Sequence, residues 1–230
     1  MRNLFEQQWI RLAAFAGLSA GALLVSSQNA VAADDWYVRV SGGVSYLADD
    51  DSAKITDETG TQKMDASFDL GYGVALAAGR WFDDRWRADI EWAYRSNDND
   101  RLKLDDGRVG DSGNFASSGL SLNGYYHFTP GREIGRVSPY VGAGVVWINE
   151  VDMDIENGEF GKDYEDLEDD GFGAQFMAGL SYRQTERWRW DAEIRWLYYG
   201  EVDMDNDRGT RVKDLDYAPL SLFVGASYSF

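Results

Sequence analysis

The last eleven residues of the chain alternate between two kinds of side chain. The apolar set and the small or mostly polar set are Leu220, Leu222, Val224, Ala226, Tyr228 and Phe230, and Ser221, Phe223, Gly225, Ser227 and Ser229. A period of two places successive side chains on opposite faces of a β-strand. One apolar face and one small, polar face are typical of a strand with lipid outside it and a crowded interior behind it. The pattern therefore predicts a membrane β-barrel whose last strand ends on an aromatic residue.

The first 32 residues have the pattern of a cleaved signal peptide. Arg2 and Arg11 lie in a polar leader, residues 12–25 form an apolar run, and residues 30–32 read Ala-Val-Ala, a small-x-small cleavage site. The apolar run is shorter than the roughly 20 residues of a membrane-spanning helix, so an uncleaved anchor is the weaker alternative. We expect residues 1–32 to be a signal peptide and residues 33–230 to form one outer-membrane β-barrel domain.

Eight segments have the alternation or the glycine and aromatic content of strands. They cover residues 36–47, 68–81, 86–96, 119–128, 139–148, 171–183, 188–199 and 219–230. Short connections (82–85, 129–138 and 184–187) alternate with long polar ones (48–67, 97–118, 149–170 and 200–218). Outer-membrane barrels alternate short periplasmic turns with long external loops in the same way. We expect an all-β fold: an eight-stranded antiparallel up-and-down transmembrane β-barrel with short periplasmic turns and four long acidic extracellular loops.

Aromatic residues gather at both ends of these predicted strands. At the periplasmic ends they are Trp36, Trp81, Trp86, Phe128, Tyr182, Trp188, Tyr228 and Phe230, and toward the outer ends Tyr46, Tyr72, Trp92, Tyr94, Trp147, Phe172, Trp196 and Tyr198. Amphipathic rings prefer the two membrane–water interfaces, so we expect two aromatic belts.

Charged residues lie on the inward face of the third and seventh predicted strands. They are Arg87, Asp89, Glu91 and Arg95, and Arg189, Asp191, Glu193 and Arg195. Because an unpaired buried ion costs several kcal/mol, these equal numbers of acids and bases predict ion pairs in the lumen. One interpretation is a network that fills the lumen. The other is a gate whose ion pairs can exchange partners and admit small ions.

The predicted long loops hold all of the excess negative charge of residues 33–230. They contain 28 acidic and 9 basic residues, a net charge of −19, which equals that of residues 33–230 as a whole. Such a surface repels nucleic acid and attracts divalent cations or basic partners. Two loops share the motif Glu-Val-Asp-Met-Asp, and alternating acids before a glycine suggest an oxygen-ligand cation site. The candidate ligands are Asp152, Asp154, Glu156, Asp203, Asp205 and Asp207, and solvated acidic loops are the alternative. No other cofactor is expected.

Several segments resemble the outer-membrane β-barrel protein family, including the transmembrane domain of outer membrane protein A and the opacity-type surface proteins. The segments are the leader, Trp36-Tyr37-Val38, the glycine-rich residues 139–144, residues 171–183 and the closing Tyr228-Ser229-Phe230. The resemblance implies an outer-membrane location, contact with lipid and lipopolysaccharide, and recognition of Tyr228 and Phe230 by the assembly machinery. A closed barrel has no open strand edge that demands a partner, so we expect a monomer.

Three classes of function fit such a chain. The favoured one is a structural or surface-interaction role, with acidic loops available to divalent cations or basic partners. The alternative is a narrow gated, porin-like channel lined by the charges of the third and seventh strands. The third is a barrel enzyme, but His127 is the only histidine and no acid near it in sequence completes a triad. We therefore expect no enzymatic activity.

Overall fold

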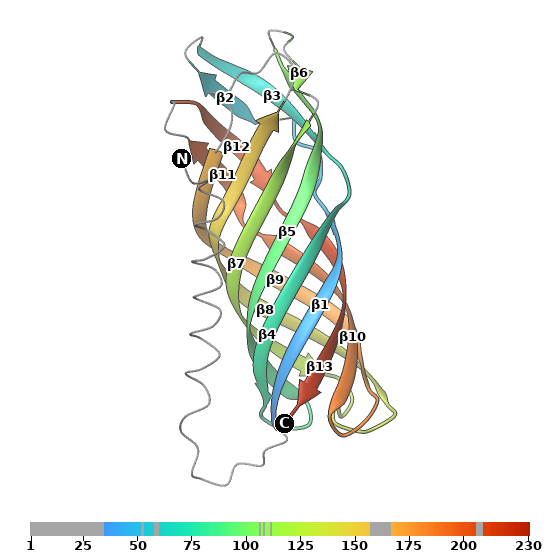
Figure 1. The fold of residues 1–230 in the computed structure, drawn as a ribbon. Coiled ribbons are helices and arrows are strands. Elements are labelled where there is room, and N and C mark those ends of the chain that lie inside the picture. Colours follow the sequence, from blue (N-terminus) through green and yellow to red (C-terminus); the bar gives the residue numbers. More distant parts are fainter. Residues whose placement is uncertain are drawn as a thin grey trace, which may run out of the picture. The chain divides into compact units, whose positions relative to one another are not determined.

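Eight long strands close into one antiparallel barrel (Figure 1). The structure is a computed structural model that describes residues 35–51, 53–57, 60–105, 107, 109–110, 112–156, 167–205 and 209–230. The predicted signal peptide lies outside these residues. Among the residues described, no helix is long and apolar enough to span a membrane.

The barrel strands agree with the eight predicted segments. They are β1 (Trp36–Tyr46), β4 (Gly71–Trp81), β5 (Trp86–Leu104), β7 (Ser112–His127), β8 (Val137–Glu156), β9 (Leu167–Arg183), β10 (Trp188–Tyr198) and β13 (Leu220–Ser229). Each pairs with the next along the chain, and β13 pairs with β1 from Tyr37 opposite Ser229 to Tyr46 opposite Leu220. The predicted eight-stranded up-and-down barrel is therefore confirmed.

The period of two decides which side chains face the interior. In β10 exposed and buried residues alternate without exception: Trp188, Trp190 and Trp196 are exposed, whereas Arg189 and Arg195 are buried. The same alternation in β13 leaves Leu220 and Leu222 exposed. A barrel of eight strands leaves an interior only wide enough for side chains to fill it.

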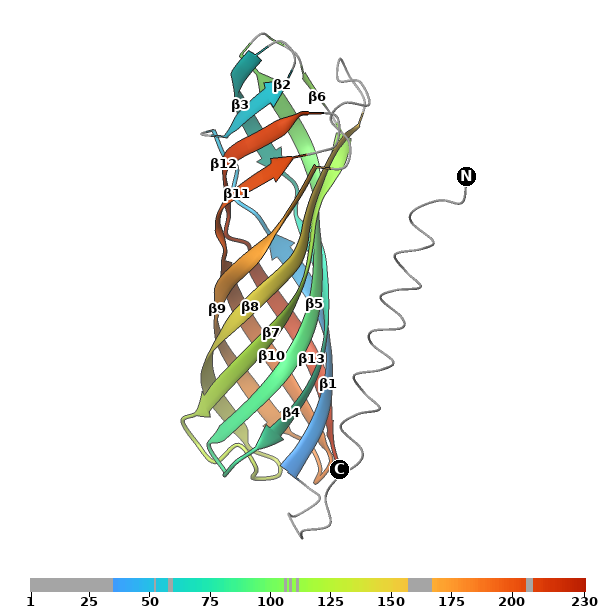
Figure 2. The ribbon, with the colours of Figure 1, turned by 90° about the vertical axis from the view of Figure 1, so that its left-hand side faces the viewer.

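The barrel continues past the outer ends of β1, β4, β10 and β13. Four further strands lie there, β2 (Lys54–Asp57), β3 (Gly60–Phe68), β11 (Gly200–Asp205) and β12 (Arg211–Tyr217), together with the two-residue β6 (Val109–Gly110). Hydrogen-bonded pairing runs from β5 through β3, β2, β12 and β11 to β9, so a second ring of strands continues the first (Figures 1 and 2). We call these strands and the adjoining outer parts of β5, β7, β8 and β9 the outer extension.

Much of each predicted long loop is therefore strand rather than irregular loop. In two of the four, residues 149–170 and 200–218, the physical reason lies in the shared Glu-Val-Asp-Met-Asp motif, in which every second residue is apolar. Val151, Met153, Val202 and Met204 have no exposed surface, because they point into the outer extension. The acids between them occupy the opposite face of the strand. A high acid content therefore concealed strand alternation in these segments.

These inward residues form a hydrophobic core, which we call the outer core. Its buried members are Leu47, Ala53, Ile55, Met64, Ala66, Phe68, Leu104, Phe115, Val146, Ile148, Val151, Met153, Leu197, Val202, Met204, Val212, Leu215 and Tyr217. Within it, the ring centroid of Phe115 lies 5.6 Å from that of Phe68 and 5.2 Å from that of Tyr217. Burial of so many apolar side chains stabilises the outer extension independently of lipid.

Candidate functional site

The middle of the lumen holds a closed network of ion pairs. The Glu91 carboxylate accepts hydrogen bonds from Arg195, including Nη2 to Oε2 at 3.1 Å, and from Arg39 Nη2 at 2.9 Å. Arg195 Nη2 also donates to Glu193 Oε1 at 2.7 Å. Arg39 lies 3.2 Å from Asp89 and 3.8 Å from Glu193. The network thus joins three strands across the barrel, and its side chains are at most 3% exposed.

Arg39 of β1 is the residue that the sequence analysis missed. It shares the inward parity of Tyr37 and Ser41, which is the one signal that could have identified it. Without Arg39, the carboxylates of β5 and β10 would face one another with too few cations between them. Like charges at short range in a low dielectric repel strongly, so Arg39 is the central cation of the network.

Neutral amides complete the hydrogen bonding of this layer. Asn123 Nδ2 donates to Asp89 Oδ1 at 3.0 Å, and Gln175 Nε2 donates to Asn123 Oδ1 at 2.6 Å. Gln175 also donates to Ser121 Oγ at 3.0 Å. Buried polar networks are stable when each member has hydrogen-bond partners. These amides supply hydrogen-bond partners in addition to those that the charged groups provide.

A layer of rings and guanidinium groups fills the lumen below the network. The Arg87 guanidinium carbon lies 3.9 Å from the centre of the Tyr125 ring, and that of Arg189 lies 4.1 Å from the Trp81 ring. Trp81 packs at a tilt against His127, with ring centroids 4.7 Å apart, and His127 stacks on Tyr140 at 5.0 Å. Cations over aromatic faces are attracted more strongly where water is excluded. We call this layer the periplasmic plug.

The turn between β7 and β8 folds over the plug. Gly131 N donates to Asp84 O at 2.8 Å, and its carbonyl accepts from Arg189 Nη2 at 2.8 Å. A Cβ atom at Gly131 would lie 2.7 Å from Trp81 and 2.8 Å from His127, so only glycine allows this close approach. The turn therefore covers the lumen at its periplasmic end.

His127 has the surroundings of a packing residue. Its Nε2 accepts from Arg87 Nε at 3.2 Å, and its Nδ1 lies 3.1 Å from Ser138 Oγ. Ser138 Oγ itself donates to Thr129 O, so in this arrangement Nδ1 is the donor. A general base needs a free lone pair toward the nucleophile, and His127 has none in this arrangement.

The eight charges predicted in the lumen are all buried there, but they do not all meet. Glu91, Glu193 and Arg195 belong to the middle network, and Asp89 joins it through Arg39. The remaining four lie above or below it, and of these Arg87 also reaches Asp89, at 3.7 Å. Arg87 and Asp191 form a 3.9 Å pair in the plug, Arg189 binds the periplasmic turn, and Arg95 lies above the network beside Phe223.

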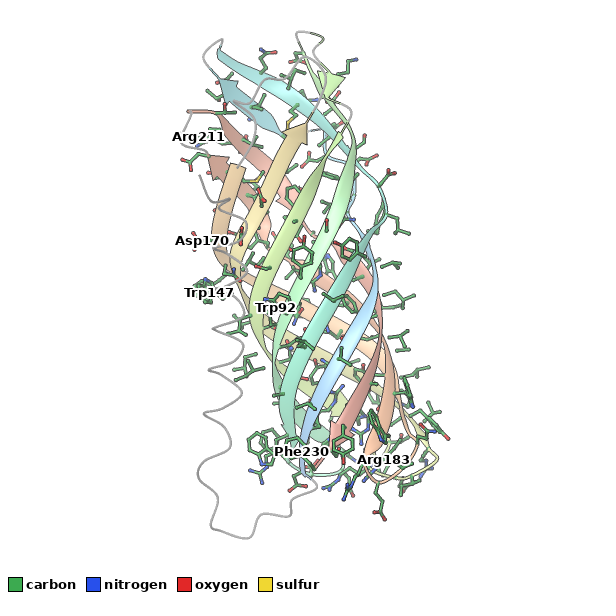
Figure 3. The ribbon with its side chains drawn as sticks, in the orientation of Figure 1. Trp92, Trp147, Asp170, Arg183, Arg211 and Phe230 are labelled. Carbon is green, nitrogen blue, oxygen red and sulfur yellow. The ribbon has the colours of Figure 1, made fainter. Side chains whose placement is uncertain are left out.

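The outer face of the barrel changes character along its length. Outward residues are apolar up to Trp147, Phe172, Trp196 and Tyr198, and on the outer extension they are charged. Figure 3 shows Trp92 and Trp147 at mid-height, Phe230 and Arg183 at one end and Arg211 at the other. The predicted belts are present with one correction. Trp81 is 2% exposed and belongs to the plug, because β4 ends with that side chain inward over the lumen.

Acids on the outer extension pair with neighbouring basic side chains. Asp205 lies 3.5 Å from Arg211, Asp203 lies 3.8 Å from Lys213, and Lys54 donates to Asp214 at 2.6 Å. The Asp214 carboxylate raises the pKa of the Lys54 ammonium above its ordinary value, by hydrogen bonding and by charge. Exposed pairs of this kind contribute little stability each, but they link β2, β11 and β12.

The predicted cation ligands are not gathered into one cluster in the part of the chain that the structure describes. Within it, no group of three or more acidic or histidine side chains is placed to hold a metal ion. Asp203 and Asp205 are exposed on β11, and Asp152 lies on β8, with β9 between the two strands. Asp207 and the side chains of Asp154 and Glu156 lie outside the described residues, so a cation site that includes them stays a prediction.

A comparison with models of protein families identifies the family of the chain. The model of the outer membrane protein beta-barrel domain matches residues 15–230. The chain belongs to this family. No protein in a comparison with curated sequences matches it.

Solved structures of other outer-membrane proteins share the fold. The outer membrane protein OprG from Pseudomonas aeruginosa aligns with a TM-score of 0.60 and 17% identity, over 86% of this chain and 97% of that one. Neisserial surface protein A aligns with a TM-score of 0.52 and 19% identity, over 85% and 97% of the two chains. At such identities the likeness concerns the fold alone.

Family membership and fold locate this barrel in the outer membrane. The apolar outer face then lies in lipid, between rings at the two interfaces. The outer extension, with its apolar interior and charged exterior, projects beyond the lipid. Family membership and the shared fold leave the role of this chain open.

Proposed function

We propose that this protein is a closed, non-enzymatic barrel that presents a rigid acidic surface to basic partners outside the cell. The observation that supports this most strongly is the filling of the lumen by three successive layers: the periplasmic plug, the ion network and the outer core. A barrel whose lumen is filled in this way acts as a support for its exposed outer surface. The His127 surroundings support the absence of catalysis.

The charge of the outer extension supports a basic partner. Its exposed acids occur on several strands, and they include Asp65, Asp105, Glu201, Asp203, Asp205 and Asp216. Strands held by a hydrophobic core keep these carboxylates in fixed positions, so a cationic partner meets a surface that needs little ordering on binding. Complementary charge also accelerates encounter and makes it sensitive to salt.

We expect the purified protein in lipid nanodiscs to bind an oligolysine peptide, measured by calorimetric titration. Affinity should fall at least tenfold at about 0.5 M salt, where the Debye length is below about 5 Å. The variant Asp105→Asn/Glu201→Gln/Asp216→Asn removes three outer acids and should weaken binding several-fold. The matched control Asp83→Asn/Asp84→Asn/Glu186→Gln changes the same charge in the periplasmic turns and should bind as the wild type does. Absence of binding at low salt, or equal losses in the two variants, would contradict the proposal.

We expect the folded protein to be electrically silent in planar bilayers. The arginines and carboxylates of the lumen hold one another at hydrogen-bond distance, and opening a path requires several such bonds to break together. Folding is checked on the same sample by the shift in gel mobility on heating. Regular conductance steps from wild-type protein would favour the channel alternative.

A further inference from the structure

At the periplasmic end of β5, an exposed arginine is held beside two rings of the outer face. Arg85 Nη1 donates to Tyr126 Oη at 3.3 Å and to Phe128 O at 3.0 Å. Trp86 is 51% exposed and lies opposite Tyr126 in the β5–β7 ladder, with ring centroids 4.9 Å apart. Asp83 Oδ1 fixes the turn by accepting hydrogen bonds from the N–H groups of Arg85 and Trp86. We call Arg85, Trp86 and Tyr126 the β5 cluster.

The same arrangement occurs at the periplasmic end of β10. Arg187 Nη1 donates to Tyr228 Oη at 2.9 Å. Trp188 is 45% exposed and lies opposite Tyr228 in the β10–β13 ladder, with ring centroids 5.2 Å apart. Thr185 Oγ1 accepts hydrogen bonds from the N–H groups of Arg187 and Trp188, as Asp83 does in the other turn. We call Arg187, Trp188 and Tyr228 the β10 cluster, and the strand order places it on the opposite side of the barrel from the β5 cluster.

The arginines of the two clusters differ from the other surface arginines at this end of the barrel. Those others bind acids or backbone carbonyl groups of the protein: Arg80 and Arg132 pair with Asp35, Arg136 pairs with Glu133, and Arg183 donates to carbonyl groups. Within the described residues, Arg85 and Arg187 form no ion pair, and their side chains donate through Nη1 alone. The edge formed by Nε and Nη2 therefore has no protein partner there. A guanidinium group binds a phosphate through two parallel hydrogen bonds from such an edge.

The level of the clusters in the membrane indicates the source of such a phosphate. Both tryptophans belong to the periplasmic belt, and amphipathic rings prefer the layer in which lipid headgroups meet the acyl chains. An arginine that donates to the neighbouring tyrosine hydroxyl is held in the same layer. Farther along the same strands the outer face is apolar, with Ile90 and Trp190 exposed. The phosphodiester of a glycerophospholipid fits this place, because its acyl chains then cover the apolar surface.

We propose that the β5 and β10 clusters are binding sites for the phosphate group of membrane glycerophospholipids, with one lipid at each cluster. The Nε and Nη2 edge of the arginine binds the phosphodiester oxygens. The tyrosine hydroxyl orients the arginine by accepting from it and has its own proton to donate to the phosphate. The tryptophan ring packs on the glycerol and the upper acyl chains. These sites lie at the other end of the barrel from the outer extension, so they are independent of what that extension binds.

Native mass spectrometry of the wild-type protein in a non-ionic detergent tests the proposal. The probe is dioctanoylphosphatidylglycerol, whose only charge is the phosphodiester, and about one molecule should bind per cluster. Arg85→Gln or Arg187→Gln should remove one of the bound lipids, and the double variant should weaken binding about five- to tenfold. The matched control Arg132→Gln/Arg136→Gln changes the same charge at the same end of the barrel. It should bind the lipid as the wild type does, because these two arginines already have carboxylate partners.

A second variant tests the role of the hydroxyls, and two further probes separate the phosphate from the chains. Tyr126→Phe/Tyr228→Phe keeps both guanidinium groups but does not orient them, so affinity should fall about two- to threefold. Dioctanoylglycerol, which has the chains without the phosphate, should bind much more weakly, and glycerol phosphate should not displace the lipid. The shift in gel mobility on heating shows that each variant is folded.

Three results would overturn the proposal. The first is equal lipid binding by Arg85→Gln/Arg187→Gln and by the control Arg132→Gln/Arg136→Gln. The second is binding of dioctanoylglycerol as strong as that of the phospholipid, because the arginines then do not recognise a phosphate. The third is displacement of the lipid by an equal concentration of glycerol phosphate, which would make the clusters sites for a soluble phosphate ester.

Discussion

Glu91→Gln is expected to destabilise the barrel by about 3–5 kcal/mol, the cost of removing one partner from a buried ion pair. Glu91 accepts hydrogen bonds from both Arg39 and Arg195, so a neutral amide leaves two guanidinium groups facing each other with less compensation. Urea unfolding in lipid vesicles, followed by tryptophan fluorescence, measures the loss. The midpoint should fall without a large change in slope, because the surface exposed on unfolding is nearly the same.

The matched control makes the same chemical change at the surface. Glu133→Gln breaks the exposed pair between Glu133 and Arg136 in a periplasmic turn, and it should cost about 0–1 kcal/mol. The double variant Glu91→Gln/Arg195→Gln should recover part of the loss, with a coupling of about 1 kcal/mol or more. If Glu91→Gln and Glu133→Gln have equal effects, the ion network does not stabilise the closed barrel.

Phe115→Ala is expected to loosen the outer extension while the barrel within the membrane stays folded. The side chain is 2% exposed and packs on Phe68 and Tyr217, so its removal leaves a cavity that costs about 3–5 kcal/mol. The ion network and the plug lie outside this cluster and are unaffected. Limited proteolysis and hydrogen exchange should show new cleavage and faster exchange in residues 53–57 and 209–217, with gel mobility unchanged.

Phe172→Ala is the control, since Phe172 is 73% exposed on the outer face of β9. It removes the same atoms without opening a cavity in the outer core, so protection of the outer extension should stay as in the wild type. Loss of the whole fold in Phe115→Ala would show that the extension and the barrel unfold as one unit. Unchanged protection would show that the outer core does not hold these strands.

The membrane part of this fold was predictable because its rule is local. Alternation in residues such as Trp188, Arg189 and Trp190 indicates which side chains face lipid. Aromatic residues indicate where the strands cross the membrane–water interfaces. The outer extension was not recognised, although Val202 and Met204 alternate with acids in the same way. There the outward face is in water, so its charge made the segment resemble a loop.

The candidate site was predictable only in part. Parity placed Glu91 and Arg195 in the lumen, but it does not say which inward residues meet. Arg39 and Trp81 show what parity alone does not predict. Arg39 is the central cation of the network, and Trp81, which was expected in the aromatic belt, lies in the plug.

Alternation along each strand is a property of neighbouring residues, and it was enough to assign the barrel, its membrane face and its acidic outer end. Contacts across the lumen depend on strand stagger and closure, which no single strand contains. Glu91 meets Arg195 from 104 positions away because β5 and β10 lie across the same narrow interior. The layered lumen therefore followed from the three-dimensional packing of the strands.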